Sequence, residues 1–141
     1  MPIRKDLRHL YDNPEWRALR WRILARAKNS CEFCRMPNMD VVVLTQNGTW
    51  RRDVTEGWIN SAGKSVPEPK GRQYVFHCVL AISHLNHVAG DNRDENLAAL
   101  CQRCHLIHDA PQHRESRAKT MRERKNNLEL PWTDNTGTTC H

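Results

Sequence analysis

Apolar residues recur at three- and four-residue intervals in the first part of the chain, which is the spacing of an amphipathic helix. The stripe consists of Trp16, Leu19, Ile23, Leu24 and Ala27. Asp12 or Asn13 can cap the helix, and Pro14 suits its first position. The pattern therefore predicts an N-terminal helix, bounded with its caps at residues 12–28, that packs its apolar face on the core.

A second pattern predicts an inserted hairpin and loop over residues 38–73. Residues 40–45 contain three consecutive valines, and Asn47-Gly48 follows as a hairpin turn signal. Residues 50–54 can supply the return strand. Residues 61–71 are rich in glycine, serine and proline, so we expect an exposed loop there.

The third region, residues 74–110, combines apolar stretches with a helix. Residues 74–85 predict one strand and residues 96–100 a short second strand or bend. A helix should follow over residues 101–110, and Pro111 should interrupt or end it. Residues 112–141 are expected to hold a basic C-terminal helix and an irregular tail from Asn126 onward.

Composition favours one domain over residues 1–141 with a thin core, because 38% of the residues are hydrophobic and 27% are charged. The net charge of +6 favours a polyanionic partner, chiefly nucleic acid. The charged N-terminus is unlike a signal peptide, and no apolar stretch is long enough for a membrane span. These features predict a cytoplasmic protein that does not associate with membranes.

Two identical cysteine pairs predict a structural zinc site. Cys31 and Cys34 form one C-x2-C knuckle, and Cys101 and Cys104 form the other. Two such knuckles complete a tetrahedron of thiolates around Zn²⁺, and no coordination position remains open for a substrate. The long separation between the pairs accommodates the insertion, because ligands need only be close in space. Of the other two cysteines, Cys78 is expected to be a buried apolar residue, and Cys140 is assigned no role.

The later motifs resemble the HNH endonuclease family. The resemblance is carried by the segments 81–87, 94–97 and 100–105, which read AISHLNH, DENL and LCQRCH. The Glu15-Trp16-Arg17-x-Leu19-Arg20 helix ahead of the first knuckle is also similar to that of many HNH proteins, particularly small phage-encoded ones. Together these matches cover about half of the chain, and their combination is more specific than any one of them.

The resemblance implies an α+β fold with a ββα-metal (His-Me finger) core, to which the four-cysteine zinc site, the N-terminal helix and the inserted hairpin are added. It also implies roles: His84 as general base, Asn96 as the residue that braces its hairpin, and His105 as a ligand of a catalytic cation. Asp109 lies four residues after His105, so a helix would place both on one face to bind one ion.

One departure from the family pattern leaves an alternative open. The family usually has an acidic residue or a histidine directly before the base, but Ser83 precedes His84. In the alternative, Asn86 and His87 take these two roles, and Asn86 is an uncharged cation ligand. We prefer His84 on spacing. His108 is expected to face solvent or phosphate rather than metal.

These residues predict hydrolysis of DNA phosphodiester bonds with the help of Mg²⁺, Mn²⁺ or another divalent metal. Arginines of the two basic helices and the second knuckle would hold the backbone, namely Arg17, Arg20, Arg103, Arg114 and Arg117. The resemblance to phage proteins implies work in genome packaging, beside a terminase subunit, or in mobility. The competing hypotheses are an inactive zinc-stabilised DNA-binding module and a toxin-like nuclease.

Overall fold

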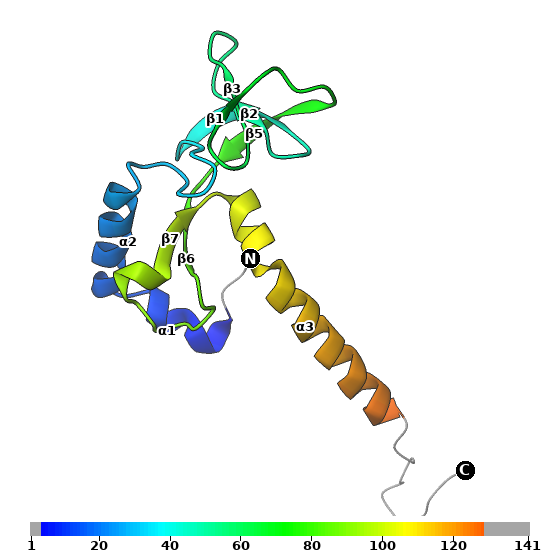
Figure 1. The fold of residues 1–141 in the computed structure, drawn as a ribbon. Helices are drawn as coiled ribbons and strands as arrows, with labels where there is room; N and C mark the ends of the chain where they lie inside the picture. The colour runs from blue at the N-terminus through cyan, green and yellow to red at the C-terminus, as the bar shows by residue number, and fades with distance from the viewer. Residues whose placement is uncertain (1–3, 129–141) are drawn as a thin grey trace, which may run out of the picture. The chain divides into compact units, whose positions relative to one another are not determined.

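The computed structural model describes residues 4–128, and the chain divides after His108 into two units. The first unit holds every strand (Figure 1). In chain order the elements are η1 (Lys5–Leu7), α1 (Arg8–Tyr11), α2 (Pro14–Arg26), β1 (Asp40–Thr45), β2 (Trp50–Arg51), β3 (Trp58–Ile59), β4 (Ser65–Val66), β5 (Gln73–Cys78), β6 (Ala81–His84), η2 (Asp94–Asn96), β7 (Leu97–Leu100) and α3 (Gln102–Leu128). The architecture is α+β, and all strand pairs are antiparallel.

Helix α2 confirms the predicted N-terminal helix. The side chain of Asn13 caps it by accepting a hydrogen bond from the Trp16 backbone N–H at 2.7 Å. Leu19, Ile23 and Leu24 are buried, as the apolar stripe requires. The same Asn13 amide donates to the carbonyls of His9 and Leu10, which links α2 to α1, a short helix that the sequence pattern does not predict.

The insertion forms a five-stranded sheet in the order β4-β3-β2-β1-β5. The predicted strand at residues 40–45 is confirmed as β1, which pairs along its whole length with β5. Part of the expected loop at 61–71 is instead β4, which pairs with β3. Val42 and Leu44 point into the core while Val41 is exposed, so the sheet has one buried face.

The single strand expected over residues 74–85 is wrong, because the structure has two strands in two different sheets. β5 joins the large sheet, whereas β6 pairs only with β7, with Ala81 opposite Leu100 and His84 opposite Leu97. The chain changes sheet at Val79 and Leu80. There the side chains of Gln102 and Asn38 accept the two backbone N–H groups that a continuous strand would have bonded within a sheet.

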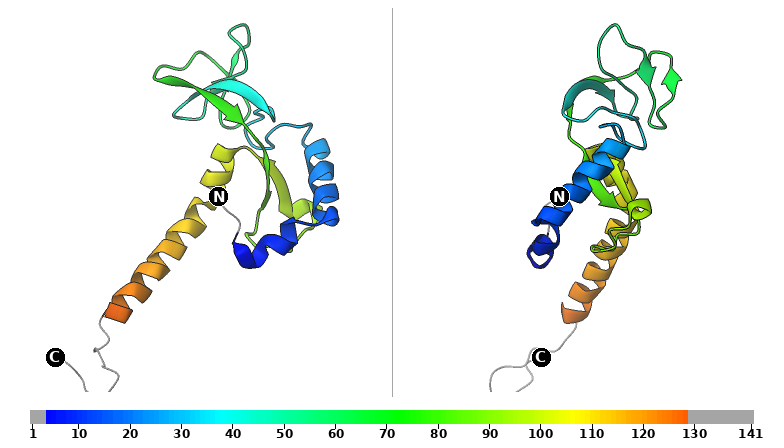
Figure 2. Two further views of the ribbon diagram at one scale, coloured as in Figure 1. Left: turned by 180° about the vertical axis from the view of Figure 1, so that it is seen from behind. Right: turned by 90° about the vertical axis from the view of Figure 1, so that its left-hand side faces the viewer.

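One apolar cluster joins the parts of the first unit. It combines Leu19 and Ile23 of α2 with Val42 of the large sheet and Leu97 of the small one. Figure 1 and the two views of Figure 2 place α2 beside the β6–β7 hairpin, in agreement with the contacts between α2 and β7. The core therefore fixes the hairpin from which the candidate site is built.

Helix α3 does not end at Pro111, contrary to the expectation from the sequence. Proline removes the hydrogen bond to the carbonyl four residues earlier, but its own φ is compatible with a helix. Both Ile107 and Pro111 are exposed, so water can bond that carbonyl. An irregular tail was predicted from Asn126 onward, but residues 126–128 are the last three residues of α3. The rest of the predicted tail lies outside the described residues. Nowhere along residues 4–128 is a helix both long and apolar enough to cross a membrane.

Candidate functional site

The four cysteines of the two knuckles lie together in the core. Their sulfur atoms are all within 4.8 Å of one another, and the sulfurs of Cys34 and Cys101 are 3.6 Å apart. A tetrahedron with zinc–sulfur bonds of about 2.3 Å separates its sulfur atoms by about 3.8 Å. The cluster is therefore compatible with a structural metal such as zinc.

Backbone hydrogen bonds shape each knuckle. The N–H of Cys31 donates to the carbonyl of Met36, and the N–H of Arg35 donates back to Cys31, which closes a tight loop around the first pair. In the second knuckle, the N–H of Cys104 points at the sulfur of Cys101 at 3.4 Å. The indole of Trp50 donates to the carbonyl of Cys34 at 2.9 Å and so attaches the large sheet to the cluster.

The thiols also influence one another's ionisation. Hydrogen bonding within the cluster, first with Cys101, lowers the pKa of Cys31. Hydrogen bonding with Cys104 in turn lowers the pKa of Cys101. One thiol of each knuckle thus favours the thiolate form, which is the form that binds zinc. Burial raises the pKa of Cys78 to about 12, so this fifth described cysteine remains a thiol at neutral pH.

A second arrangement places two histidines face to face. The rings of His87 and His108 stack with centroids 4.7 Å apart and planes 25° from parallel. Nε2 of His108 lies 3.1 Å from the carbonyl oxygen of Leu85. A carbonyl only accepts, so Nε2 carries a proton, and in the neutral form of the ring Nδ1 then has the lone pair. A metal-binding histidine commonly has this second hydrogen bond to a carbonyl.

Asn96 braces the loop that carries His87. This buried amide donates to the side-chain oxygen of Asn86 and to the carbonyl of Asp91, and it accepts from the Asn86 backbone N–H. His87 itself has a φ of 60°, a left-handed conformation that is costly without glycine. Asn96 thus holds the loop of His87 in place, whereas the sequence interpretation expected it to brace the hairpin that carries His84.

Asn86 is occupied by the loop itself. Its side-chain oxygen accepts hydrogen bonds from Val88 and Asn96, while its nitrogen donates to Asp91 at 2.7 Å. The Arg93 guanidinium beside Asp91, together with the Asn86 amide, holds the pKa of that carboxyl far below its usual range. Asn86 is therefore a turn-forming residue with little capacity left for a cation.

His84, the base preferred on spacing, lies in an aromatic enclosure. It ends β6 with only 8% of its surface exposed. Its ring stacks on Trp16 with centroids 5.7 Å apart and meets the edge of Tyr11, while Nε2 lies 2.9 Å from the side-chain oxygen of Asn92. A ring packed in this way can stabilise the hairpin against α1 and α2, but it offers little access to a phosphodiester.

The candidate cation ligands on α3 do not all belong to one group. The group of possible ligand atoms around His87 includes His108, whereas His105 is not among it, within the part of the chain that the structure describes. His108 was the residue that sequence reasoning missed. Its position four residues after Cys104 places it on the face of the helix that carries the knuckle. Asp109 follows His108 directly and begins the second unit.

The arginines proposed for DNA binding have different surroundings. Arg17 and Arg20 line a pocket beside α2. Arg103 lies against the backbone of Gly48 in the turn between β1 and β2. Arg114 and Arg117 are exposed on the part of α3 in the second unit. The structure does not gather these arginines into one described surface.

Comparison with protein-family models, with curated proteins and with solved structures finds no match to this chain. The class of the protein is therefore defined by its own geometry, an α+β chain with a buried four-cysteine cluster and a stacked histidine pair beside a small hairpin.

Proposed function

We propose that the protein is a metal-dependent endonuclease of the HNH type that hydrolyses DNA phosphodiester bonds, with His87 as its general base. The observation that supports this proposal is the stacking of two histidines, His87 on the loop between β6 and β7 and His108 on α3. The type of reaction is inferred from the resemblance of the sequence to the HNH family. Because His87 stacks on His108, we now prefer His87 to His84 as the general base.

Access to solvent favours His87 over His84. His87 is half-buried on a braced loop, so a water molecule beside its ring can reach solvent and substrate. A neutral imidazole accepts a proton from such a water near pH 7, which makes the water a better nucleophile toward phosphorus. Four other non-glycine residues share a positive φ, so the backbone strain at His87 supports this role only in combination with the stacking.

His108 and Asp109 are the proposed ligands of the catalytic cation. Nδ1 of His108 has the free lone pair, and Asp109 supplies a carboxylate from the next position in the chain. When bound, a cation such as Mg²⁺ or Mn²⁺ polarises the phosphate and stabilises the leaving oxygen. His105 stays in the proposal only as a helical neighbour of the zinc knuckle, and the four cysteines keep the structural role.

The decisive experiment compares histidine variants on supercoiled plasmid DNA with Mg²⁺, Mn²⁺ or Ni²⁺ added. His87→Ala should slow conversion to nicked or linear DNA by about 10²- to 10⁴-fold, the usual contribution of a general base. His108→Ala should raise the metal concentration needed for half-maximal cleavage. His77→Ala is the matched control, because this histidine is exposed on β5 and should cut like wild type.

His84→Ala separates the two candidate bases. It should lower the thermal midpoint, because it leaves a cavity beside Trp16, while activity per folded molecule stays within a few fold of wild type. Loss of cleavage in His84→Ala with full activity in His87→Ala would return the role to His84 and contradict our assignment.

One observation favours a second candidate, an inactive DNA-binding module. Asn86 stands where the family has an acidic or histidine ligand, and its side-chain oxygen is already used twice within the loop. A protein that shifts DNA on a gel but cuts it with none of the metals would support this candidate instead.

A further inference from the structure

A pocket of about 500 Å³ lies beside α2, and none of the residues of the cysteine cluster or the histidine pair lines it. Two large apolar side chains that line this pocket are mostly exposed to solvent. The indole of Trp21 is 74% exposed and Met39 is 66% exposed, while Leu24 lies buried at its base. A large aromatic side chain left this open presents a flat face to any ligand that enters.

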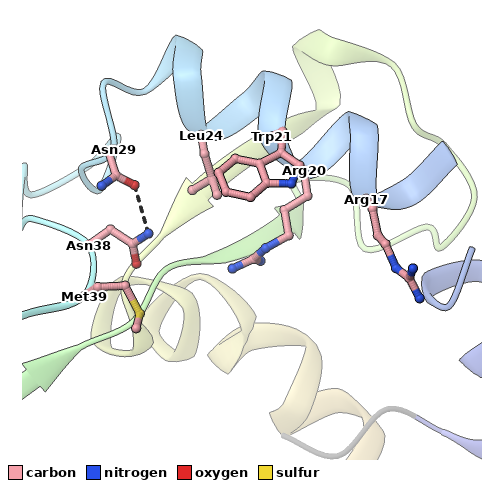
Figure 3. A pocket seen from close by; sticks show the side chains of 7 residues that line it. All are labelled: Arg17, Arg20, Trp21, Leu24, Asn29, Asn38 and Met39. Carbon is pink, nitrogen blue, oxygen red and sulfur yellow. Dashed lines mark hydrogen bonds between the residues drawn. The ribbon is translucent and has the colours of Figure 1, made fainter. Parts of the chain in front are cut away.

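The charge at the pocket is positive. Of the four arginines on α2, Arg22 binds Asp94 and Arg26 binds Glu32, so both have structural partners. Arg17 and Arg20 line the pocket and project from the same helix as Trp21 (Figure 3). No acidic side chain lines it.

The two pocket arginines keep most of their capacity for a ligand. Arg17 makes a 3.3 Å ion pair with Asp12, in which both side chains are largely exposed, and solvent weakens such a pair. Arg20 donates one hydrogen bond to the carbonyl of Leu80 and retains its other donors. An anion beside Trp21 would therefore meet two guanidinium groups.

Two amides complete the rim. The side chain of Asn38 donates to the side-chain oxygen of Asn29 at 2.9 Å and accepts from the backbone N–H of Leu80 (Figure 3). Asn38 is fixed by these two bonds and in turn orients Asn29. Because the side-chain oxygen of exposed Asn29 accepts this bond, its amide nitrogen can donate a hydrogen bond to a polar group of a ligand. The pocket thus combines a flat aromatic face, a fixed amide donor and positive charge.

We propose that this pocket binds an unpaired base of a nucleic-acid strand, with the base stacked on Trp21 and its neighbouring phosphates held by Arg17 and Arg20. The proposal rests on the proposed function for the presence of a nucleic-acid substrate and adds how a single strand is held. Stacking on an aromatic ring tolerates every base because each base has a π face. The site would thus hold strands without reading their sequence.

The test measures binding of a fluorescent single-stranded oligonucleotide by anisotropy. The strand has about 12 nucleotides, within the usual range of single-strand sites. The protein is the full chain purified with zinc present, and it carries the His87→Ala change that is expected to slow cutting. Trp21→Ala should weaken binding about tenfold, whereas Trp21→Phe should stay within about twofold. Val75→Ala is the matched control, because Val75 is also 74% exposed but lies on β5.

An abasic strand of equal length identifies the contact. Trp21→Ala should leave its affinity unchanged, while Arg17→Gln and Arg20→Gln should weaken binding of both strands and flatten the salt dependence. The proposal is overturned if Trp21→Ala binds the normal strand like wild type, if it weakens both strands equally, or if polyglutamate competes as well as the oligonucleotide does. If the wild-type protein cuts plasmid but Trp21→Ala does not change binding of the strand, the pocket proposal is wrong and the proposed function stands. Absence of any binding to DNA removes the proposed function as well.

Discussion

At the scale of single residues, Gly48 in the turn between β1 and β2 is constrained by its backbone conformation and by a neighbouring side chain. Its φ is +85°, and a Cβ placed there would overlap the guanidinium of Arg103. Gly48→Ala should therefore destabilise the protein by about 1–2 kcal/mol through the backbone conformation, and moving the flexible end of Arg103 aside should add little. The midpoint of urea unfolding measures this change.

The same substitution in an Arg103→Ala background isolates the contact. There the loss should be nearly the same as in the wild-type background, because the flexible guanidinium of Arg103 can move aside and the backbone conformation supplies most of the effect. An unchanged urea midpoint for Gly48→Ala in the wild-type background would mean that the turn does not have this conformation.

The histidines show where residue-level reasoning from sequence stops. The four cysteines could be grouped from their spacing, because a knuckle is a local feature that needs only two intervening residues. Spacing favoured His84 over His87, but the feature that separates them is the packing of Trp16 and Tyr11 around His84 from a distant part of the chain. His108 was set aside because nothing local reveals that a loop returns to stack on it.

At the scale of elements, two arginines of helix α2 make ion pairs and hydrogen bonds to the segment that leads into β7, in addition to the apolar contacts of the helix. Arg22 makes two hydrogen bonds with Asp94 at 2.6 and 3.1 Å, and Arg26 reaches the carbonyls of Asp94 and Leu97. These contacts hold η2 and the start of β7 against α2. The positive charges of α2 are thus divided, because Arg22 and Arg26 have structural partners whereas Arg17 and Arg20 line the pocket.

This attachment predicts a dependence of stability on pH. The hydrogen bonds from Arg22 lower the pKa of Asp94, so the ionised carboxylate is favoured by folding. Its contribution is present above the ordinary pKa of 3.8 and is lost as the pH falls through the lower pKa of the folded state. Asp94→Asn should therefore unfold at a lower urea concentration than wild type at pH 7, and the difference should shrink below about pH 4.

A difference that grows toward acid pH would contradict this assignment of the stabilising form. Asp6→Asn is a suitable control, since within residues 4–128 that carboxylate pairs with its near neighbour Arg4, and both side chains are exposed.

Elements with strong local signals could be predicted, and those fixed by distant partners could not. The cap and apolar stripe of α2 lie within its own residues, and β1 is marked by its valines and the turn that follows. The boundary between β5 and β6 has no local signal, because apolar residues continue across it. It is set by Asn38 and Gln102, which accept the two N–H groups from other parts of the chain.

At the scale of the whole molecule, the cysteine cluster should determine whether the first unit folds. Cys31→Ser should lose bound metal and cooperative unfolding together, because the free energy of metal binding contributes to folding. Cys78→Ser is a matched control, since both residues are fully buried but only Cys31 belongs to the cluster. Zinc content by mass spectrometry and thermal melting by circular dichroism measure the two effects.

Cys78→Ser should retain its metal and melt cooperatively, with a modestly lower midpoint. Cooperative melting of Cys31→Ser at the wild-type midpoint would show that the core holds without metal. Metal loss in Cys78→Ser would show that the cluster is wider than four thiols.

The attachment of the large sheet between the two knuckles has an evolutionary consequence. Cys34 and Cys101 are 67 positions apart, and the sheet occupies the chain between them. The entropic cost of closing a flexible loop rises only with the logarithm of its length, by about 0.6 kcal/mol for each doubling. Two knuckles that meet at a metal would therefore make the interval between them tolerant of gain and loss. Lineages of this chain can then exchange the sheet for a different segment that also covers the core, while the two knuckles and the histidine pair pass on unchanged.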